Sequence, residues 1–211
     1  MTPSRESGKK DEWKKEESLI LTTPTNKPSS FIHKPSSKIT IFNFQCSMFN
    51  KKTNWEEETE ARVAKGVAYF KEGYNCAQSV ARAFADAYDV PLPLMTLMSA
   101  SFGAGIGRMR ETCGTASGMF MLAGLETASV EASQETKARN YAAVQELAAD
   151  FKAQTGSLIC RELLKGYVKD VNTNPTPEAR TDEYYRKRPC VRMVELAIRT
   201  YMAWLKRRQE S

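Results

Sequence analysis

Apolar side chains recur every three or four residues along most of the chain after residue 54, which is the spacing of amphipathic helices. Gly73 and Gly156 are typical helix stops, and Asn75 is a good N-cap. The pattern predicts helices that begin at residues 55, 75, 112, 133 and 190, an apolar segment over 92–102 and a short helix that opens at Cys160. The last helix has the clearest apolar stripe, at Val191, Val194, Ile198, Tyr201 and Leu205.

The chain, with 211 residues, is long enough for one domain with its own core. The short apolar run 39–44 could form a strand or a docking segment, but no later segment offers a strand partner. We therefore expect an all-α fold, a compact helical bundle of about five to six helices with a disordered N-terminal extension. The bundle is assigned to residues 55–211 and the extension to residues 1–54.

The N-terminal extension differs from the rest in composition. Lys, Glu, Ser, Thr and Pro dominate its first 47 residues, and its prolines interrupt any helical pattern. This low-complexity composition predicts disorder, and the abrupt change after it makes Met48 an alternative start of the protein.

The net charge of +6 does not indicate a nucleic-acid partner, because half of the excess lies in residues 1–47. The chain has no apolar run of about 18 residues, and its first residues are too polar for a signal peptide, so we expect no transmembrane segment and a cytoplasmic protein. Cysteines in a reducing cytosol serve metal binding or thiol chemistry more often than structural cross-linking.

The cysteines of the helical region share one local context. Each lies at or near a predicted helix N-terminus, and the four are Cys76, Cys113, Cys160 and Cys190, which follow Asn75, Thr112, Ile159 and Pro189 respectively. Unpaired N–H groups and the positive end of the helix dipole stabilise a thiolate, the form that binds metals and attacks electrophiles. The alternative is that all four are ordinary buried cysteines, which behave as small hydrophobes. The sequence contains no Cys-x-x-Cys pair.

Small and charged residues near these cysteines are candidates for shaping the site. The loop glycines Gly103, Gly105 and Gly107 permit close backbone approach, expected beside Cys113, and Gly114 and Gly118 permit close helix packing. Arg161 is a candidate for lowering the pKa of Cys160 or for donating a hydrogen bond to a bound cluster.

Four ordered blocks of residues resemble the C_GCAxxG_C_C family of redox-active proteins over roughly residues 60–205. The blocks are Tyr74 to Val80, Phe102 to Gly107 with Cys113 to Gly118, Gly156-Ser157 with Cys160 to Leu163, and Pro189-Cys190. Thr115 stands where the family usually has Ala, which changes no candidate ligand. The family is similar to a domain of the split-Soret cytochromes, and this likeness implies a non-haem iron cluster near the cysteines.

Haem is not expected, because the chain lacks Cys-x-x-Cys-His and its only histidine is His33. The resemblance implies electron transfer or redox sensing through an iron–sulfur cluster that the four cysteines hold as metal ligands. Four thiolates could also close a structural zinc site, or pair as two reversible disulfides that make them redox-active thiols. Cys46 is expected to take part in none of these sites.

No substrate pocket is evident in the sequence, so whether the protein is an oxidoreductase or an electron carrier stays open. An unidentified redox protein is the expected partner. The apolar stripe of the last helix, if exposed, could support a homodimer.

Overall fold

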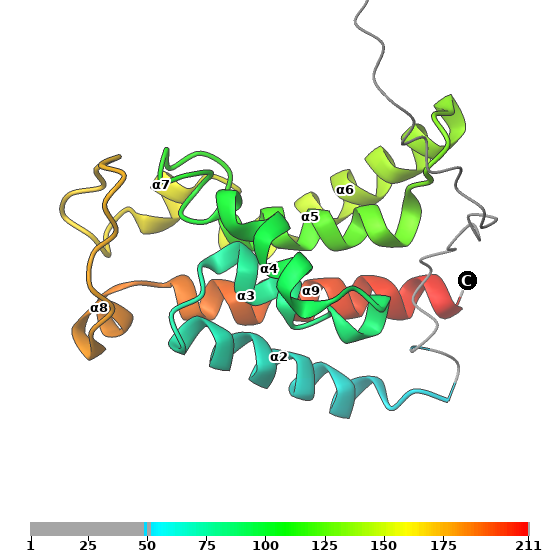
Figure 1. Ribbon diagram of the computed structural model, residues 1–211, viewed down its shortest axis with the longest axis horizontal. Helices are drawn as coiled ribbons and strands as arrows, with labels where there is room; N and C mark the ends of the chain where they lie inside the picture. Colours follow the sequence, from blue (N-terminus) through cyan, green and yellow to red (C-terminus); the bar gives the residue numbers. More distant parts are fainter. Residues whose placement is uncertain (1–48, 50–51, 211) are drawn as a thin grey trace, which may run out of the picture. The chain divides into compact units, whose positions relative to one another are not determined.

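The computed structural model describes Phe49 and residues 52–210, which belong to one compact unit, Asn43–Ser211. These residues contain eight α-helices, two short 3-10 helices and no strand, which confirms the all-α prediction (Figure 1). The α-helices are α2 (Trp55–Lys71), α3 (Cys76–Arg82), α4 (Leu92–Ser99), α5 (Gly114–Thr127), α6 (Gln134–Thr155), α7 (Cys160–Leu164), α8 (Asp182–Lys187) and α9 (Cys190–Glu210), and the 3-10 helices are η1 (Asp86–Tyr88) and η2 (Ala100–Phe102).

The helix count is higher than the five to six expected from the sequence, partly because α8 lies in a charged stretch with the composition of a surface connection. Thr181 caps α8 by accepting a hydrogen bond from the backbone N–H of Tyr184. The expectations for residues 1–48, including the extension, segment 39–44 and Cys46, lie outside the described residues. The domain boundary at residue 55 stays a prediction.

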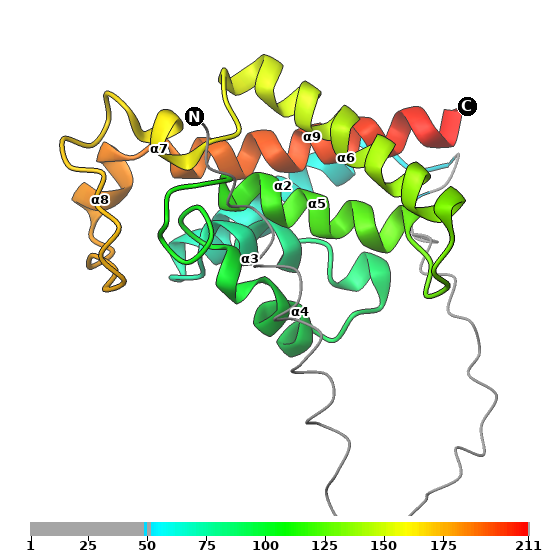
Figure 2. The ribbon, with the colours of Figure 1, turned by 90° about the horizontal axis from the view of Figure 1, so that it is seen from above.

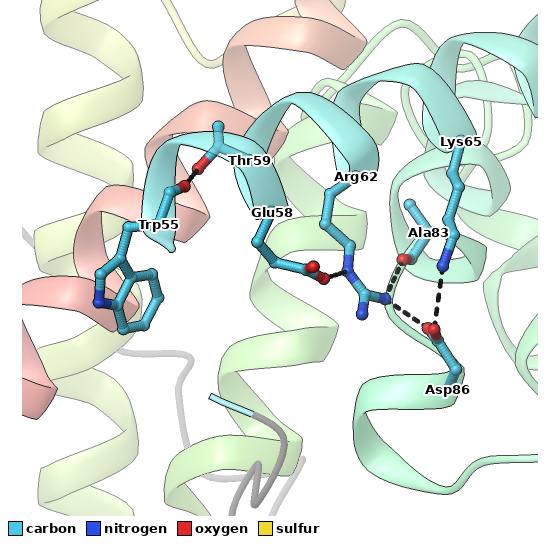
Figure 3. A network of polar contacts seen from close by, with 7 residues as sticks. All are labelled: Trp55, Glu58, Thr59, Arg62, Lys65, Ala83 and Asp86. Carbon is cyan, nitrogen blue, oxygen red and sulfur yellow. Dashed lines mark hydrogen bonds and ion pairs between the residues drawn. The ribbon is translucent and has the colours of Figure 1, made fainter. Parts of the chain in front are cut away.

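Helix α6 begins and ends where the sequence predicts, since Ser133 is its N-cap and Gly156 its C-cap with a φ of 83°. Helix α3 ends at Arg82, and the chain continues as a turn into η1. The fully buried Arg62 of α2 explains this ending, because its guanidinium binds the Ala83 carbonyl at 2.7 Å and the Asp86 carboxylate (Figure 3). The carbonyl at the end of α3 is thus satisfied by a side chain instead of by a further helical turn.

Helix α9 runs through the middle of the bundle, with α2 on one side of it and α5 and α6 on the other (Figure 1). Its apolar stripe is buried within the chain, because Val194, Ile198, Tyr201 and Leu205 are at most 2% exposed. The last helix therefore buries most of the apolar stripe that could have supported a homodimer, and the oligomeric state stays a prediction. Among the described residues, no helix combines the length and the apolar character needed to cross a membrane.

In both ribbon views, α7, α8, the start of α9 and the loop before α5 gather at the same end of α9 (Figures 1 and 2). Helices α5 and α6 pack on each other, and the chain therefore returns to this end after leaving it through α5. The packing of α3 against α5 depends on Gly118, where a Cβ atom would meet the Ala77 carbonyl oxygen at 2.8 Å and Val80 Cβ at 3.1 Å.

Gly118→Ala should therefore destabilise the fold. The overpacking cost of about 1–3 kcal/mol should exceed the gain of about 1 kcal/mol from replacing a helical glycine. Gly124→Ala is the matched control on the same helix, since nothing lies within 4 Å of a Cβ there. Urea unfolding should show a lower free energy of unfolding for Gly118→Ala and a slightly higher one for Gly124→Ala. Equal stabilisation of both variants would contradict the packing argument.

Candidate four-cysteine site

Each of the four cysteines lies at the start of a helix, as the sequence predicts. Cys76, Cys160 and Cys190 are the first residues of α3, α7 and α9, and Cys113 is the N-cap of α5. The predicted cap Thr112 is one residue too early, because its backbone forms an isolated antiparallel bridge with Ile159.

This bridge fixes Cys113 beside Cys160. The N–H of Cys113 donates to the Leu158 carbonyl at 2.7 Å, and the N–H of Cys160 donates to the Glu111 carbonyl at 2.7 Å. Two cysteines that are far apart in the sequence are thus held by short backbone hydrogen bonds. These backbone bonds fix where the two cysteine side chains begin, while their rotamers decide where the sulfurs lie.

Cys76 is positioned by a capping box at the start of α3. The Asn75 side chain accepts hydrogen bonds from Ala77 N and Gln78 N at 3.0 Å each, and Gln78 Oε1 accepts from Asn75 N at 3.0 Å. The start of α5 lies against this turn, because a Cβ atom on Gly114 would approach Cys76 Sγ to 3.2 Å.

The four cysteines line a single cavity with two arginines, a tyrosine and several apolar residues. Its lining is Cys76, Ala104, Arg110, Cys113, Thr115, Cys160, Leu163, Leu164, Tyr184, Arg188, Pro189, Cys190 and Met193. The cavity volume of about 30 Å³ leaves room for about two water molecules. Cys113 and Cys160 are buried and Cys76 and Cys190 are half-buried, so one side of the site lies near the surface.

The predicted site-shaping glycines do not line the cavity, and four of the five pack tightly on neighbouring residues. An added Cβ atom would lie 2.7 Å from Cys160 Cβ at Gly105 and 3.2 Å from Cys76 Sγ at Gly114. It would meet the Asn75 side chain at Gly103 and Ala77 at Gly118, whereas at Gly107 it would meet nothing within 4 Å. The close approach that we expected beside Cys113 is therefore made by Gly105 beside Cys160.

The loop that carries Gly105 has a left-handed backbone from Ala104 to Arg108, with φ between 54° and 74° at all five residues, and Arg110 follows at 63°. Non-glycine residues adopt this conformation at a cost of about 1–2 kcal/mol each. Hydrogen bonds from Gly107 N to Ser101 O at 2.8 Å and from Glu111 N to Gly105 O at 3.1 Å hold it in place. Strain that the surrounding structure maintains in this way is a common feature of functional loops.

Burial favours the protonated form of three of the four thiols. It raises the pKa of Cys113 to about 12, and the pKa values of Cys160 and Cys190 are also raised, first by burial and then by the neighbouring Cys76. We expected the helix N-termini to favour thiolates, and for these three cysteines that expectation is wrong. Loss of hydration and mutual repulsion outweigh the helix dipole unless a cation neutralises the thiolates.

Arg161 does not face the cavity. Its side chain is half exposed, forms an ion pair with Glu111, and donates from Nε to the Arg110 carbonyl at 3.3 Å. The cations at the cavity are Arg110, which is 4% exposed, and Arg188, whose side chain is 8% exposed. Sequence reasoning missed both, because each belongs to a charged run with the composition of a solvated surface. Only the position of Arg188, directly before Pro189-Cys190, offered a signal.

The donor set suits a thiolate-bound metal centre in type and number, since soft thiolates are preferred ligands of iron–sulfur clusters and zinc. Within the described residues, the side chains as they stand do not bring three His, Cys, Asp or Glu groups close enough to hold a metal ion. Coordination would therefore require the cysteine side chains to turn, and rotation about χ1 can move a sulfur without moving the backbone.

The fold is all-α, and each of four helices has at its start a cysteine that lines the same cavity. This arrangement defines a class of helical proteins with a four-cysteine site. The family model described as "Putative redox-active protein (C_GCAxxG_C_C)" matches residues 74–204. The chain belongs to this family. No curated protein and no solved structure matches it.

The raised pKa of Cys113 predicts that the metal-free protein loses stability in alkali. The unfolded chain releases this proton near pH 9, whereas the folded protein keeps it to about pH 12, so the stabilisation is present below the unfolded value and is lost as pH rises. Urea unfolding should show the free energy of unfolding falling above about pH 9, by at most about 1.4 kcal/mol per pH unit for this group. Cys113→Ser should show a shallower fall, and identical curves would contradict the assignment.

Gly105→Ala should disrupt the site, because the new Cβ would lie 2.7 Å from Cys160 Cβ and 2.8 Å from Arg110 Cα. Gly107→Ala is the control in the same loop, with similar backbone strain and nothing within 4 Å. Thermal unfolding should show a loss of about 1–2 kcal/mol for Gly107→Ala from strain alone and about 1–3 kcal/mol more for Gly105→Ala from overpacking. Equal losses would mean that Gly105 is not in tight contact with the site.

Proposed function

We propose that this protein is an electron-transfer or redox-sensing protein whose four cysteines, Cys76, Cys113, Cys160 and Cys190, hold an iron–sulfur cluster. The observation that carries the proposal is the convergence of the four thiols on one cavity. Every pair among them interacts electrostatically, which means that the four behave as one site. When bound, such a cluster supplies one-electron chemistry.

The surroundings of the cysteines support a role in redox chemistry. Apolar side chains such as Leu163, Leu164 and Met193 line the cavity beside the cysteines. Burial and hydrogen bonding around the sulfurs are the means by which proteins set a cluster's reduction potential. Cys76 and Cys190 are half-buried, so a redox partner could approach that side of the site.

Thiol–disulfide exchange has less support than a metal centre. It needs an accessible thiolate, whereas burial raises the pKa of Cys113, Cys160 and Cys190. A structural zinc ion would use the same four ligands and leave no open position. Both remain outcomes of the experiment below. A reducing cytosol is the compartment we propose, since it would keep the cysteines available as ligands.

Anaerobically purified protein should contain iron and acid-labile sulfide and should absorb visible light. Replacing Cys76, Cys113, Cys160 and Cys190 by Ser should abolish all three properties, because the hydroxyl is a poor ligand for iron in such clusters. Cys46→Ser, outside the four-cysteine pattern, is the matched control and should retain them. Stoichiometric zinc without iron would replace this proposal with a structural site, and reversible thiol loss without metal would favour disulfide chemistry.

A further inference from the structure

Arg110 is a buried cation in the wall of the four-cysteine cavity. It is 4% exposed, and its Nε donates to the Asn172 carbonyl at 2.9 Å. No carboxylate in the described part of the chain forms an ion pair with it. Its neighbours differ in this respect, because Arg161 is paired with Glu111 and Arg188 with Glu178.

A buried guanidinium without a counter-ion is costly, because the protein interior replaces its hydration poorly. Arginine cannot reduce this cost by losing a proton, since its pKa is too high. A hydrogen bond to a neutral carbonyl compensates part of this cost, and a neighbouring anion compensates more. The groups that share the cavity with Arg110 and can become anionic there are the four cysteines and Tyr184.

The backbone around Arg110 fixes its side chain in this position. The Arg110 carbonyl accepts from Arg161 N at 3.1 Å, and residue 110 itself has a positive φ of 63°. Arg108 binds the same residue that Arg110 binds, since its Nη2 donates to Asn172 Oδ1 at 3.3 Å. The Nε atom is thus anchored to residue 172, and the guanidinium lies at the cavity.

We propose that Arg110 is the counter-ion of the four-cysteine centre, stabilising the negative charge of the deprotonated, metal-bound cysteines, with Arg188 as a second and partly neutralised cation. The inference rests on the proposed function. Four thiolates around a doubly charged metal or cluster core leave a net charge of about −2. Arg110 compensates part of this charge, and Arg188 contributes less because Glu178 shares it.

The electrostatics of the thiols are in keeping with this assignment. Arg110 opposes the rise in the pKa of Cys160 through its charge and a hydrogen bond. Arg188 acts in the same direction, more weakly than Arg110 on Cys160, and it also opposes the rise in the pKa of Cys190. A positive charge beside a cluster also stabilises its reduced form, which carries one more electron, so Arg110 should raise the reduction potential.

The test compares Arg110→Gln, which removes the charge and keeps donors, with Arg110→Lys, which keeps the charge. Arg199→Gln is the matched control, because Arg199 is a partly exposed arginine paired with Glu60. In cluster-loaded protein, the ratio of reduced to oxidised centre at a fixed ambient potential should fall about tenfold in Arg110→Gln, which is 59 mV for one electron. Arg110→Lys should recover most of this loss, and Arg199→Gln should equal the wild type.

A second readout uses metal-free protein and separates this inference from the proposed function. The rate of Cys160 alkylation by iodoacetamide, followed by peptide mass, should fall several-fold in Arg110→Gln and not in Arg199→Gln. If the wild type binds no metal, the proposed function fails, and the alkylation rates still decide whether Arg110 stabilises the thiolate.

Equal behaviour of Arg110→Gln and Arg199→Gln in both readouts would overturn the inference. So would an effect of Arg161→Gln as large as that of Arg110→Gln, since Arg161 lies outside the cavity lining. If Arg110→Gln does not fold, Arg110→Lys decides the matter. If Arg110→Lys has a reduction potential and a Cys160 alkylation rate near the wild-type values, the result supports a role of the positive charge. A clear loss in both readouts would overturn the inference.

Discussion

The backbone pairing of residues 110–113 with 158–161 is the constraint on which the candidate site depends. Its two short hydrogen bonds place Cys113 and Cys160 side by side at the starts of α5 and α7. The pairing requires α6 to return the chain along α5, and the Asn140 side chain helps by donating to Thr127 Oγ1 at 2.9 Å. The site is therefore a product of helix packing, with each cysteine fixed at a helix start.

Burial and charge act against each other at this site. Burial favours neutral thiols, whereas metal binding requires thiolates, and cations reconcile the two by stabilising the charged form. Arg110 and Arg188 line the cavity, where we propose this role for them, while the more conspicuous Arg161 is paired with Glu111 at the surface. The left-handed loop before Cys113 leads into Arg110, which itself has a positive φ.

The network around the buried Arg62 connects α2 with the end of α3. Arg62 joins Glu58, the Ala83 carbonyl and Asp86, and it ends α3 on the side away from Cys76 (Figure 3). Unlike Arg110, Arg62 has carboxylate partners, which satisfy its charge within the fold. Arg62 and Arg110 therefore differ in their surroundings, since Arg62 is paired with carboxylates and Arg110 lines the cavity of the cysteines.

The sequence by itself determined the all-α class, the course of α6 and α9 and the placement of four cysteines at helix starts, because helical periodicity and capping are local properties. Tertiary structure decided which cation faces Cys160 and where α3 ends, since both depend on contacts between distant segments. Local pattern likewise favoured thiolates at helix N-termini, but the pKa values follow burial, which only the packed chain creates. The apolar stripe of α9 was evident from the sequence, whereas its cover by α2, α5 and α6 was not.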